Sequence, residues 1–442
     1  MAQGARAFRG RRSFSGGRRC AARVVVVAAA AIAAMASAWA SPVRSAAGAQ
    51  PRLNVIYMVQ AGYQPEQFAE MTREFTKESG IDVTVNFVRY DEEYQKIVMS
   101  ASSPVATYDV VLMDLIWVAE FAEKGYVVPL ERGLASKARQ DIPRVVLEAF
   151  EHRGRLWAMP FLANLHFLFY NADMLKRAGF DSPPATLEEM ETQMRELKRK
   201  GIVTYPMIAS WNQKEGLVCE YVWLVGAYGG DIFDLHGKPT FNGGPGLVAL
   251  ETMVRWMREG LVNPLALTAD ELVAKDVFIA GKAAFAPNWT FLCGLMNDPD
   301  VSQIAGHGKM SLLPVASAVR DKLGCVSSSV SGFQGLAVTA NSSHKDEAWR
   351  YVEFMTSPGV QMRFPEEVPV WTSLLMSPDA RTRDPLLDIK LEQMRWLHHR
   401  PKLVRYPEIS AVLQRFLHAA LEGSLSPERA LGLAEERIRS LP

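Results

Sequence analysis

The chain has 442 residues, of which 49 are lysine or arginine and 48 are aspartate or glutamate. One hydrophobic core rarely grows to this size, so the length predicts two lobes. The balanced charge lacks the basic stripe that a nucleic-acid-binding protein would need, so no nucleic-acid partner is expected.

Residues 1–40 have the three parts of a secretory signal peptide. Residues 1–23 contain seven arginines and no acidic residue, and an apolar run of valines and alanines follows. Ala38-Trp39-Ala40 then forms a small-x-small cleavage pattern. The apolar run is shorter than the ~20 residues of a membrane span. We therefore exclude residues 1–40 from the fold and expect an exported, periplasmic protein.

Two details of this export signal stay open. A second candidate cleavage point follows Ala49. Arg11-Arg12-Ser13-Phe14 resembles the twin-arginine export pattern, although an ordinary arginine-rich leader also explains it.

Three cysteines remain after the leader, namely Cys219, Cys293 and Cys325. An odd number allows at most one disulfide. Either all three are unpaired thiols, or Cys293 pairs with Cys325, since both fall in the segment that we assign to one lobe.

Strand and helix patterns alternate over the first part of the mature chain. The expected elements are a strand at 53–59, a helix at 65–79, a strand at 81–87, a helix at 92–101 and a strand at 109–113. This order predicts βαβ units and a mainly parallel sheet. Open sheets of this kind bind ligands beyond the carboxyl ends of their strands, which draws attention to loops 61–64 and 114–117.

The later part of the chain is richer in helix patterns. Thr186 and Glu189 form a capping box, and the helix that they start ends before Gly201. Further helices are expected at 215–227 and 245–259, after a cap at Ser343, and from residue 384 to the end.

A search for catalytic and metal-binding motifs finds none. The chain has no His-Glu-x-x-His, no Gly-x-Ser-x-Gly and no Cys-x-x-Cys sequence. Asp231, Asp234 and Gly237 have the wrong spacing for a calcium loop and are interpreted as a polar turn. We therefore expect no catalytic residue, no metal and no cofactor.

Several segments, in the right order, resemble family 1 of the extracellular solute-binding proteins, the maltose-binding-like group that serves ABC sugar importers. They are 108–114 with 117 and 121–130, 157–161 with 168–171, 183–190, 229–231 with 237–242, 278–285 through 289, and 332–340 before 341–349. The likeness covers nearly the whole mature chain. Residues 162–166 depart from it, because many relatives carry Asp-Gly or Asp-Asn there.

The resemblance implies an α/β fold of the periplasmic binding protein-like type II class. Two α/β lobes are joined by a hinge of crossing strands, and the ligand lies between them. Each lobe is discontinuous: residues 51–162 plus 288–336 are expected in lobe 1, and residues 163–287 plus 337–442 in lobe 2.

A sugar site needs flat aromatic rings and side chains that donate and accept hydrogen bonds together. Three of the candidates also have a structural interpretation. Asp114 would cap its own helix, Trp117 would pack between helix and sheet, and His166 would be a structural histidine. The candidate ligand-binding residues are Tyr63, Asp114, Trp117, Asn164, His166, Trp211, Glu220, Asn288, Trp289, Gly332, Phe333 and Trp371.

The predicted function is capture of a carbohydrate or polyol by hinge closure, followed by delivery to the transmembrane subunits of an ABC permease. We expect a monomer and no covalent chemistry. Two alternatives stay open. The same fold can bind a non-sugar solute, such as a phosphorylated polyol, a polyamine or an iron complex. An exported carbohydrate-active enzyme is the other.

Overall fold

The computed structural model describes residues 51–59, 63–364 and 367–441. The expected signal peptide, the twin-arginine pattern and both cleavage points lie outside these ranges. Within them, no helix is both long enough and apolar enough to cross a membrane.

A five-stranded sheet forms the centre of lobe 1, in the order β2-β1-β3-β11-β6. Strand β1 runs parallel to β2 and β3, whereas β11 runs antiparallel to β3 and β6. The predicted βαβαβ start of the chain is confirmed. The strands are β1 (Arg52–Met58), β2 (Asp82–Val88), β3 (Val110–Asp114), β6 (Met159–Leu162) and β11 (Gln334–Val338).

Helices cover this sheet, and the hydrophobic pattern of α1 shows why. Phe68, Met71 and Phe75 recur on one face and are buried, and Gly80 ends the helix with a φ of 70°. The helices of lobe 1 are α1 (Pro65–Ser79), α2 (Tyr90–Ala101), α3 (Val118–Glu123), α4 (Arg132–Asp141), α5 (Arg144–Phe150), α13 (Lys345–Met355), α14 (Pro358–Gln361) and α15 (Thr372–Leu375). A short hairpin joins β4 (Glu151–His152) to β5 (Arg155–Leu156).

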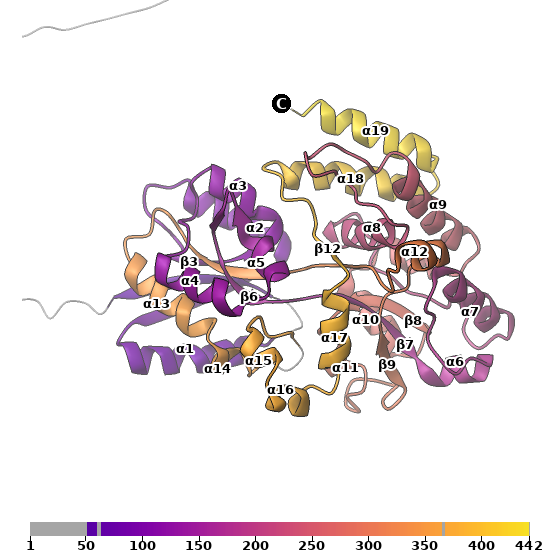
Figure 1. Cartoon of the computed structure of the whole chain (residues 1–442), viewed down its shortest axis with the longest axis horizontal. Helices are drawn as coiled ribbons and strands as arrows, with labels where there is room; N and C mark the ends of the chain where they lie inside the picture. Colours follow the sequence, from indigo (N-terminus) through magenta and orange to yellow (C-terminus); the bar gives the residue numbers. More distant parts are fainter. Residues whose placement is uncertain (1–50, 60–62, 365–366, 442) are drawn as a thin grey trace, which may run out of the picture. The chain divides into compact units, whose positions relative to one another are not determined.

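Lobe 2 has a smaller antiparallel sheet, in the order β8-β7-β9. Its strands are β7 (His166–Asn171), β8 (Phe285–Trp289) and β9 (Gly308–Ser311). Its helices include α6 (Ala172–Ala178), α7 (Leu187–Arg199), α8 (Glu215–Ala227), α9 (Gly244–Arg258), α10 (Glu271–Ile279), α11 (Leu292–Leu295) and α12 (Ser317–Leu323). In Figure 1, these elements lie on the right and those of lobe 1 lie on the left.

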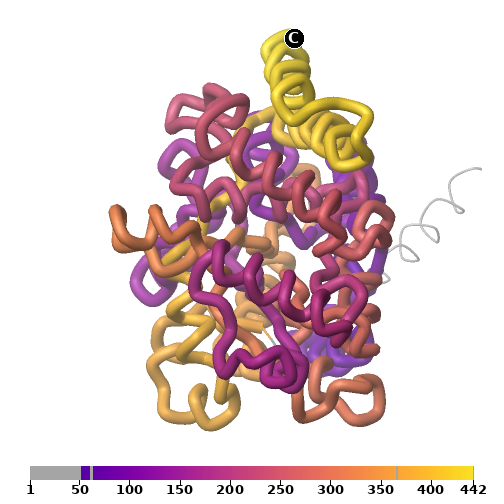
Figure 2. Tube along the Cα trace, turned by 90° about the vertical axis from the view of Figure 1, so that its right-hand side faces the viewer, coloured from indigo at the N-terminus to yellow at the C-terminus, as the bar shows by residue number. Residues whose placement is uncertain are grey.

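The C-terminal helices complete lobe 2. Helix α18 (Tyr406–Leu421) contacts α8 and α9, and α19 (Pro427–Arg439) contacts α18 and α9. Both are yellow at the top of Figure 2. Before them, α16 (Pro378–Arg383) and α17 (Leu387–Met394) bring the chain back from lobe 1.

The strand pairing corrects the expected division of the lobes. Residues 288–336 were expected in lobe 1, but β9 pairs with β7, which keeps most of this segment in lobe 2. Residues 337–442 were expected in lobe 2, yet β11 pairs with β3 and β6, and α13 packs on β11 and α1. The physical reason is that the chain stays in lobe 2 after β8, where it forms β9, and crosses to lobe 1 only when it leaves β10.

Three crossing segments lie beside one another between the lobes. The first joins β6 to β7, and the second joins β10 (Ser329–Val330) to β11. Leu165 of the first pairs with Ser331 of the second. The third includes β12 (Leu397–His398), which pairs with β10. Its His399 and Lys402 then donate to backbone carbonyls of α5 and β4 in lobe 1.

Candidate functional site

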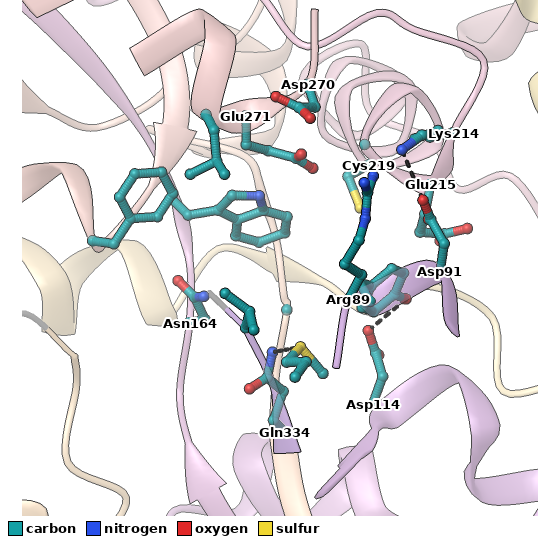
Figure 3. Close-up of a pocket in the computed structure, with 18 of the residues that line it drawn as sticks. Arg89, Asp91, Asp114, Asn164, Lys214, Glu215, Cys219, Asp270, Glu271 and Gln334 are labelled. Carbon is teal, nitrogen blue, oxygen red and sulfur yellow. Dashed lines mark hydrogen bonds and ion pairs between the residues drawn. The ribbon is translucent and has the colours of Figure 1, made fainter. Parts of the chain in front are cut away.

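A cavity of about 450 Å³ is lined by residues of both lobes. On the side of lobe 1, its residues lie at or just beyond the carboxyl ends of three parallel strands: Met58 and Val59 at the end of β1, Arg89 to Asp91 after β2, and Asp114 at the end of β3. This is the edge at which open α/β sheets bind ligands. Lobe 2 contributes the first residues of α8 and α10 and the end of β8 (Figure 3).

A buried ionic network links the two lobes at the cavity wall. Arg400 donates from Nη2 to both oxygens of Asp114, at 2.8 and 3.1 Å, and from Nη1 to Glu215 at 3.0 Å. The hydroxyl of Tyr90 donates to Asp114 at 3.0 Å. Asp114 belongs to lobe 1 and Glu215 to lobe 2, and the Arg400 side chain is only 2% exposed. A charge buried in this way depends on its partners.

A second ion pair crosses the cavity nearer to solvent. Lys214 precedes α8 and lies 2.7 Å from Asp91 of α2 (Figure 3). Both side chains are more than two-fifths exposed, so this pair contributes ~0–1 kcal/mol to stability.

An aromatic wall is formed by Trp289 at the end of β8. The ring of His166 packs against its indole with centroids 3.9 Å apart. Gly332 lies so close that a Cβ there would be 2.7 Å from Cζ3 of the indole. Burial, together with the charge of Arg400, lowers the pKa of His166 to about 3, so this imidazole is neutral and serves as packing. Met58, Leu272 and Phe291 add apolar surface to the cavity.

Two carboxylates, Asp270 and Glu271, lie at the start of helix α10, on the same side of the cavity as Lys214 (Figure 3). Asp270 caps the helix by accepting from the backbone N–H of Val273 at 3.0 Å. Burial, followed by the charge of Asp270, raises the pKa of Glu271, against the opposing influence of the nearby Trp289 side chain.

Four of the twelve predicted site residues line the cavity: Asp114, Asn164, Trp289 and Gly332. Asp114 also caps its own short helix, because its Oδ1 accepts from the backbone N–H of Ile116. Asn164 is anchored by Thr290, whose hydroxyl donates to its Oδ1.

The other eight do not line the cavity, and all are buried: Tyr63, Trp117, His166, Trp211, Glu220, Asn288, Phe333 and Trp371. Three of them are held in lobe 1. Tyr63 donates to the carbonyl of Met58 at 2.7 Å, and Trp371 donates to that of Thr356 at 2.7 Å. Trp117 stacks on Tyr90 at 5.7 Å and so supports the cavity wall from behind.

The remaining buried candidates stabilise the hinge and lobe 2. Glu220 accepts from Trp223 Nε1 at 2.7 Å, and burial raises its pKa to about 8. Asn288 donates to the backbone carbonyl of Glu271 at 3.1 Å, which ties β8 to α10. Trp211 is part of the core of lobe 2, and Phe333 packs its ring against His399.

Sequence reasoning missed most of the charged residues at the site. Tyr90 and Asp91 directly follow β2, so the rule for strand ends could have found them. Arg400 gives no such signal, because it lies in an irregular segment near the C-terminus.

Two smaller expectations concern the polar turn at Asp234 and the cysteines. Asp234 Oδ1 accepts two backbone N–H groups and forms a polar turn.

The sulfurs of Cys293 and Cys325 contact different groups. Cys293 Sγ lies 3.4 Å from Met310 Sδ, and Cys325 Sγ lies near the carbonyl of Leu323. The alternative of a Cys293–Cys325 bridge is therefore not realised in the structure.

Comparison with known proteins adds independent information. Residues 61–362 match the family model of bacterial extracellular solute-binding proteins. The chain is 26% identical over 361 residues to a probable ABC transporter-binding protein of Deinococcus radiodurans, which covers 78% of this chain and 82% of that protein. It is 24% identical over 388 residues to the mannitol-binding protein of Pseudomonas aeruginosa, which covers 81% and 86%.

Solved structures show the same fold. The maltose-bound MalE3 of T. maritima superposes with a TM-score of 0.79 at 22% identity, over 88% of this chain and 99% of that one. A solute-binding protein of Agrobacterium radiobacter K84 in complex with ribitol gives a TM-score of 0.77 at 22% identity, over 88% and 98%.

Proposed function

Because the chain belongs to the family of bacterial extracellular solute-binding proteins, we propose that it captures a carbohydrate or polyol between its lobes and delivers it to the permease of an ABC importer. The observation that carries this proposal is the cavity between the lobes, with an indole on one wall and hydrogen-bonding groups from both lobes around it. The maltose, ribitol and mannitol named for its relatives are ligands of the same class.

The chemistry of the cavity wall suits such a ligand. The indole of Trp289 offers an apolar face to ring C–H groups, whereas Asn164, Asp114 and Arg400 offer donors and acceptors to hydroxyl groups. Pockets for small ligands typically have volumes of ~300–1,000 Å³, and this one falls within that range.

Capture proceeds by closure of the hinge. A solute that contacts Asp114 in lobe 1 and Trp289 in lobe 2 binds the closed form more tightly than the open form. It therefore shifts the population toward the closed form, by as much as the two affinities differ. The closed form then docks on the permease, the monomer acts alone, and no covalent bond is made or broken.

Family membership indicates a periplasmic or extracellular location. We propose that residues 1–40 direct export and are then removed. Determination of the N-terminal sequence of the secreted protein tests this, since an unprocessed Met1 would contradict it.

A thermal-shift screen of the mature protein, residues 41–442, tests the proposed function. The panel contains sugars, polyols and sugar acids, with phosphorylated polyols and polyamines as rivals. A ligand present at one hundred times its dissociation constant adds ~2.7 kcal/mol of stability, which raises the melting temperature measurably. A shift with a sugar or polyol supports the proposal. A shift with only phosphates or polyamines would overturn the ligand class but leave the role in transport.

A further inference from the structure

The cavity wall carries more negative than positive side chains among the described residues. The five carboxylates are Asp91, Asp114, Glu215, Asp270 and Glu271, and the three cations are Arg89, Lys214 and Arg400. Five acids less three bases leave a net charge of −2 at full ionisation. Such a wall repels a phosphate group and attracts a positive charge.

Two of the three cations of the wall are already engaged by other carboxylates. Arg400 is shared between Asp114 and Glu215, and Lys214 pairs with Asp91. Arg89 lies at the start of α2 and forms no ion pair in the described part of the chain, and in the view of Figure 3 its guanidinium lies between Glu271 and Asp91. In the described part of the chain, neither Asp270 nor Glu271 forms an ion pair, so these two carboxylates are the acids of the wall that no cation engages directly.

Glu271 is positioned for more than charge. Its carboxyl group lies close enough to the side chain of Trp289 for the two to interact, although burial is the largest influence on the pKa of Glu271. Gly216 permits this position, because a Cβ there would be 2.6 Å from Glu271 Oε1. An ammonium group gains from both neighbours, since an aromatic face attracts cations and a carboxylate accepts charge-assisted hydrogen bonds.

A separate observation on the same wall indicates what else the ligand carries. The side chain of Arg400 is 2% exposed and lines the cavity, yet its Nε has no hydrogen-bond partner among the described residues. A buried donor without a partner is costly, and a hydroxyl oxygen of a ligand would satisfy it. The two features together call for a ligand that has hydroxyl groups and a positive charge.

We propose that Glu271 and Asp270, with the indole of Trp289, form a subsite for a protonated amino group. The solute is then an aminated carbohydrate or polyol rather than a neutral or phosphorylated one. This inference rests on the proposed function, because it names the substrate class of the same cavity.

The test is calorimetric titration of the mature protein at about pH 6.5, below the ~7.7–8.0 range of α-amino groups. The probes are matched pairs: D-glucosamine against D-glucose, and 1-amino-1-deoxy-D-sorbitol against D-sorbitol. N-acetyl-D-glucosamine is added as a sugar whose nitrogen carries no charge. The amine of at least one pair is expected to bind ten-fold or more tightly than its hydroxyl counterpart.

Two variants assign the preference. Glu271→Gln retains the shape of the side chain and is expected to reduce the amine preference to less than about three-fold. Asp276→Asn removes an exposed charge from the same helix and is expected to retain the preference. Circular dichroism and the melting temperature verify that both variants fold.

The possible outcomes distinguish a failure of the amine subsite from a failure of the proposed function. If the hydroxyl compounds bind as tightly as the amines, the amine subsite is wrong and the proposed function stands. If the preference persists in Glu271→Gln, the assignment of the subsite to Glu271 is wrong. If the folded wild-type protein binds no member of either pair or of the wider sugar and polyol panel, the proposed function fails and this inference fails with it.

Discussion

Removal of the guanidinium of Arg400 is expected to destabilise the protein far more than removal of a surface arginine. In Arg400→Met, the carboxylates of Asp114 and Glu215, with side chains 5% and 12% exposed, lose the cation that lies between them. Breaking a buried ion pair from one side costs ~3–5 kcal/mol, because the remaining charge stays buried without a partner. Tyr90 and Ile116 still donate to Asp114, so we expect the lower part of that range.

Urea denaturation of the ligand-free protein, followed by circular dichroism, measures this loss. Arg381→Met is the matched control, because Arg381 and its partner Asp388 are 44% and 75% exposed and their pair contributes ~0–1 kcal/mol. A double variant, Arg400→Met with Asp114→Asn, removes one orphaned charge and is expected to lose less than the two single variants added together. Equal losses in Arg400→Met and Arg381→Met would refute the reasoning.

Three further predictions concern buried groups near the cavity. Burial raises the pKa of Glu220 from 4.5 to about 8, so between these values the unfolded chain has lost a proton that the folded protein keeps, and stability falls as pH rises. Glu220→Gln is expected to reduce this fall, measured by urea denaturation at about pH 5 and about pH 9; an unchanged difference would contradict the assignment. Burial lowers the pKa of His166 from 6.5 to about 3, so the unfolded chain takes up a proton first and stability falls as pH drops through that window. His166→Phe is expected to weaken this acid sensitivity in acid-denaturation curves, and an identical midpoint would argue against it. Gly332→Ala places a Cβ 2.7 Å from the indole of Trp289 and is expected to weaken solute binding ten-fold or more, whereas Gly359→Ala, whose Cβ meets nothing within 4 Å, is expected to leave binding unchanged; equal affinities in a titration would exclude this role.

Local patterns predicted the first half of lobe 1 well. The helix at α1 and the strands β1 to β3 are encoded in short-range periodicity, and the parallel order follows from the lengths of the connections. The carboxyl-end rule then identified Asp114, because its position depends only on where β3 ends.

Features that depend on long-range strand pairing were harder to predict from the sequence. Nothing near residue 288 reveals that the chain turns back to place β9 beside β7, so the lobe boundaries after that point were wrong. Aromatic residues posed the same difficulty. Trp289 and Trp371 look alike in the sequence, but only the tertiary contacts expose one to the cavity and hydrogen-bond the other to Thr356.

Arg400 illustrates the greatest gap between sequence and site. It lies 286 residues from Asp114 and 185 from Glu215, in a segment without a periodic pattern. Its role arises only because the third crossing segment brings it between the lobes.

The most direct test of the account is calorimetric titration of the solute that the thermal-shift screen selects into the wild-type protein, Trp289→Ala and Trp396→Ala. Trp289 lines the cavity, whereas Trp396 lies outside it and donates to Glu392. We expect one site per wild-type molecule, a loss of affinity of one-hundred-fold or more in folded Trp289→Ala, and nearly unchanged binding in Trp396→Ala. Undiminished binding in Trp289→Ala would show that the solute is not held between the lobes at this indole.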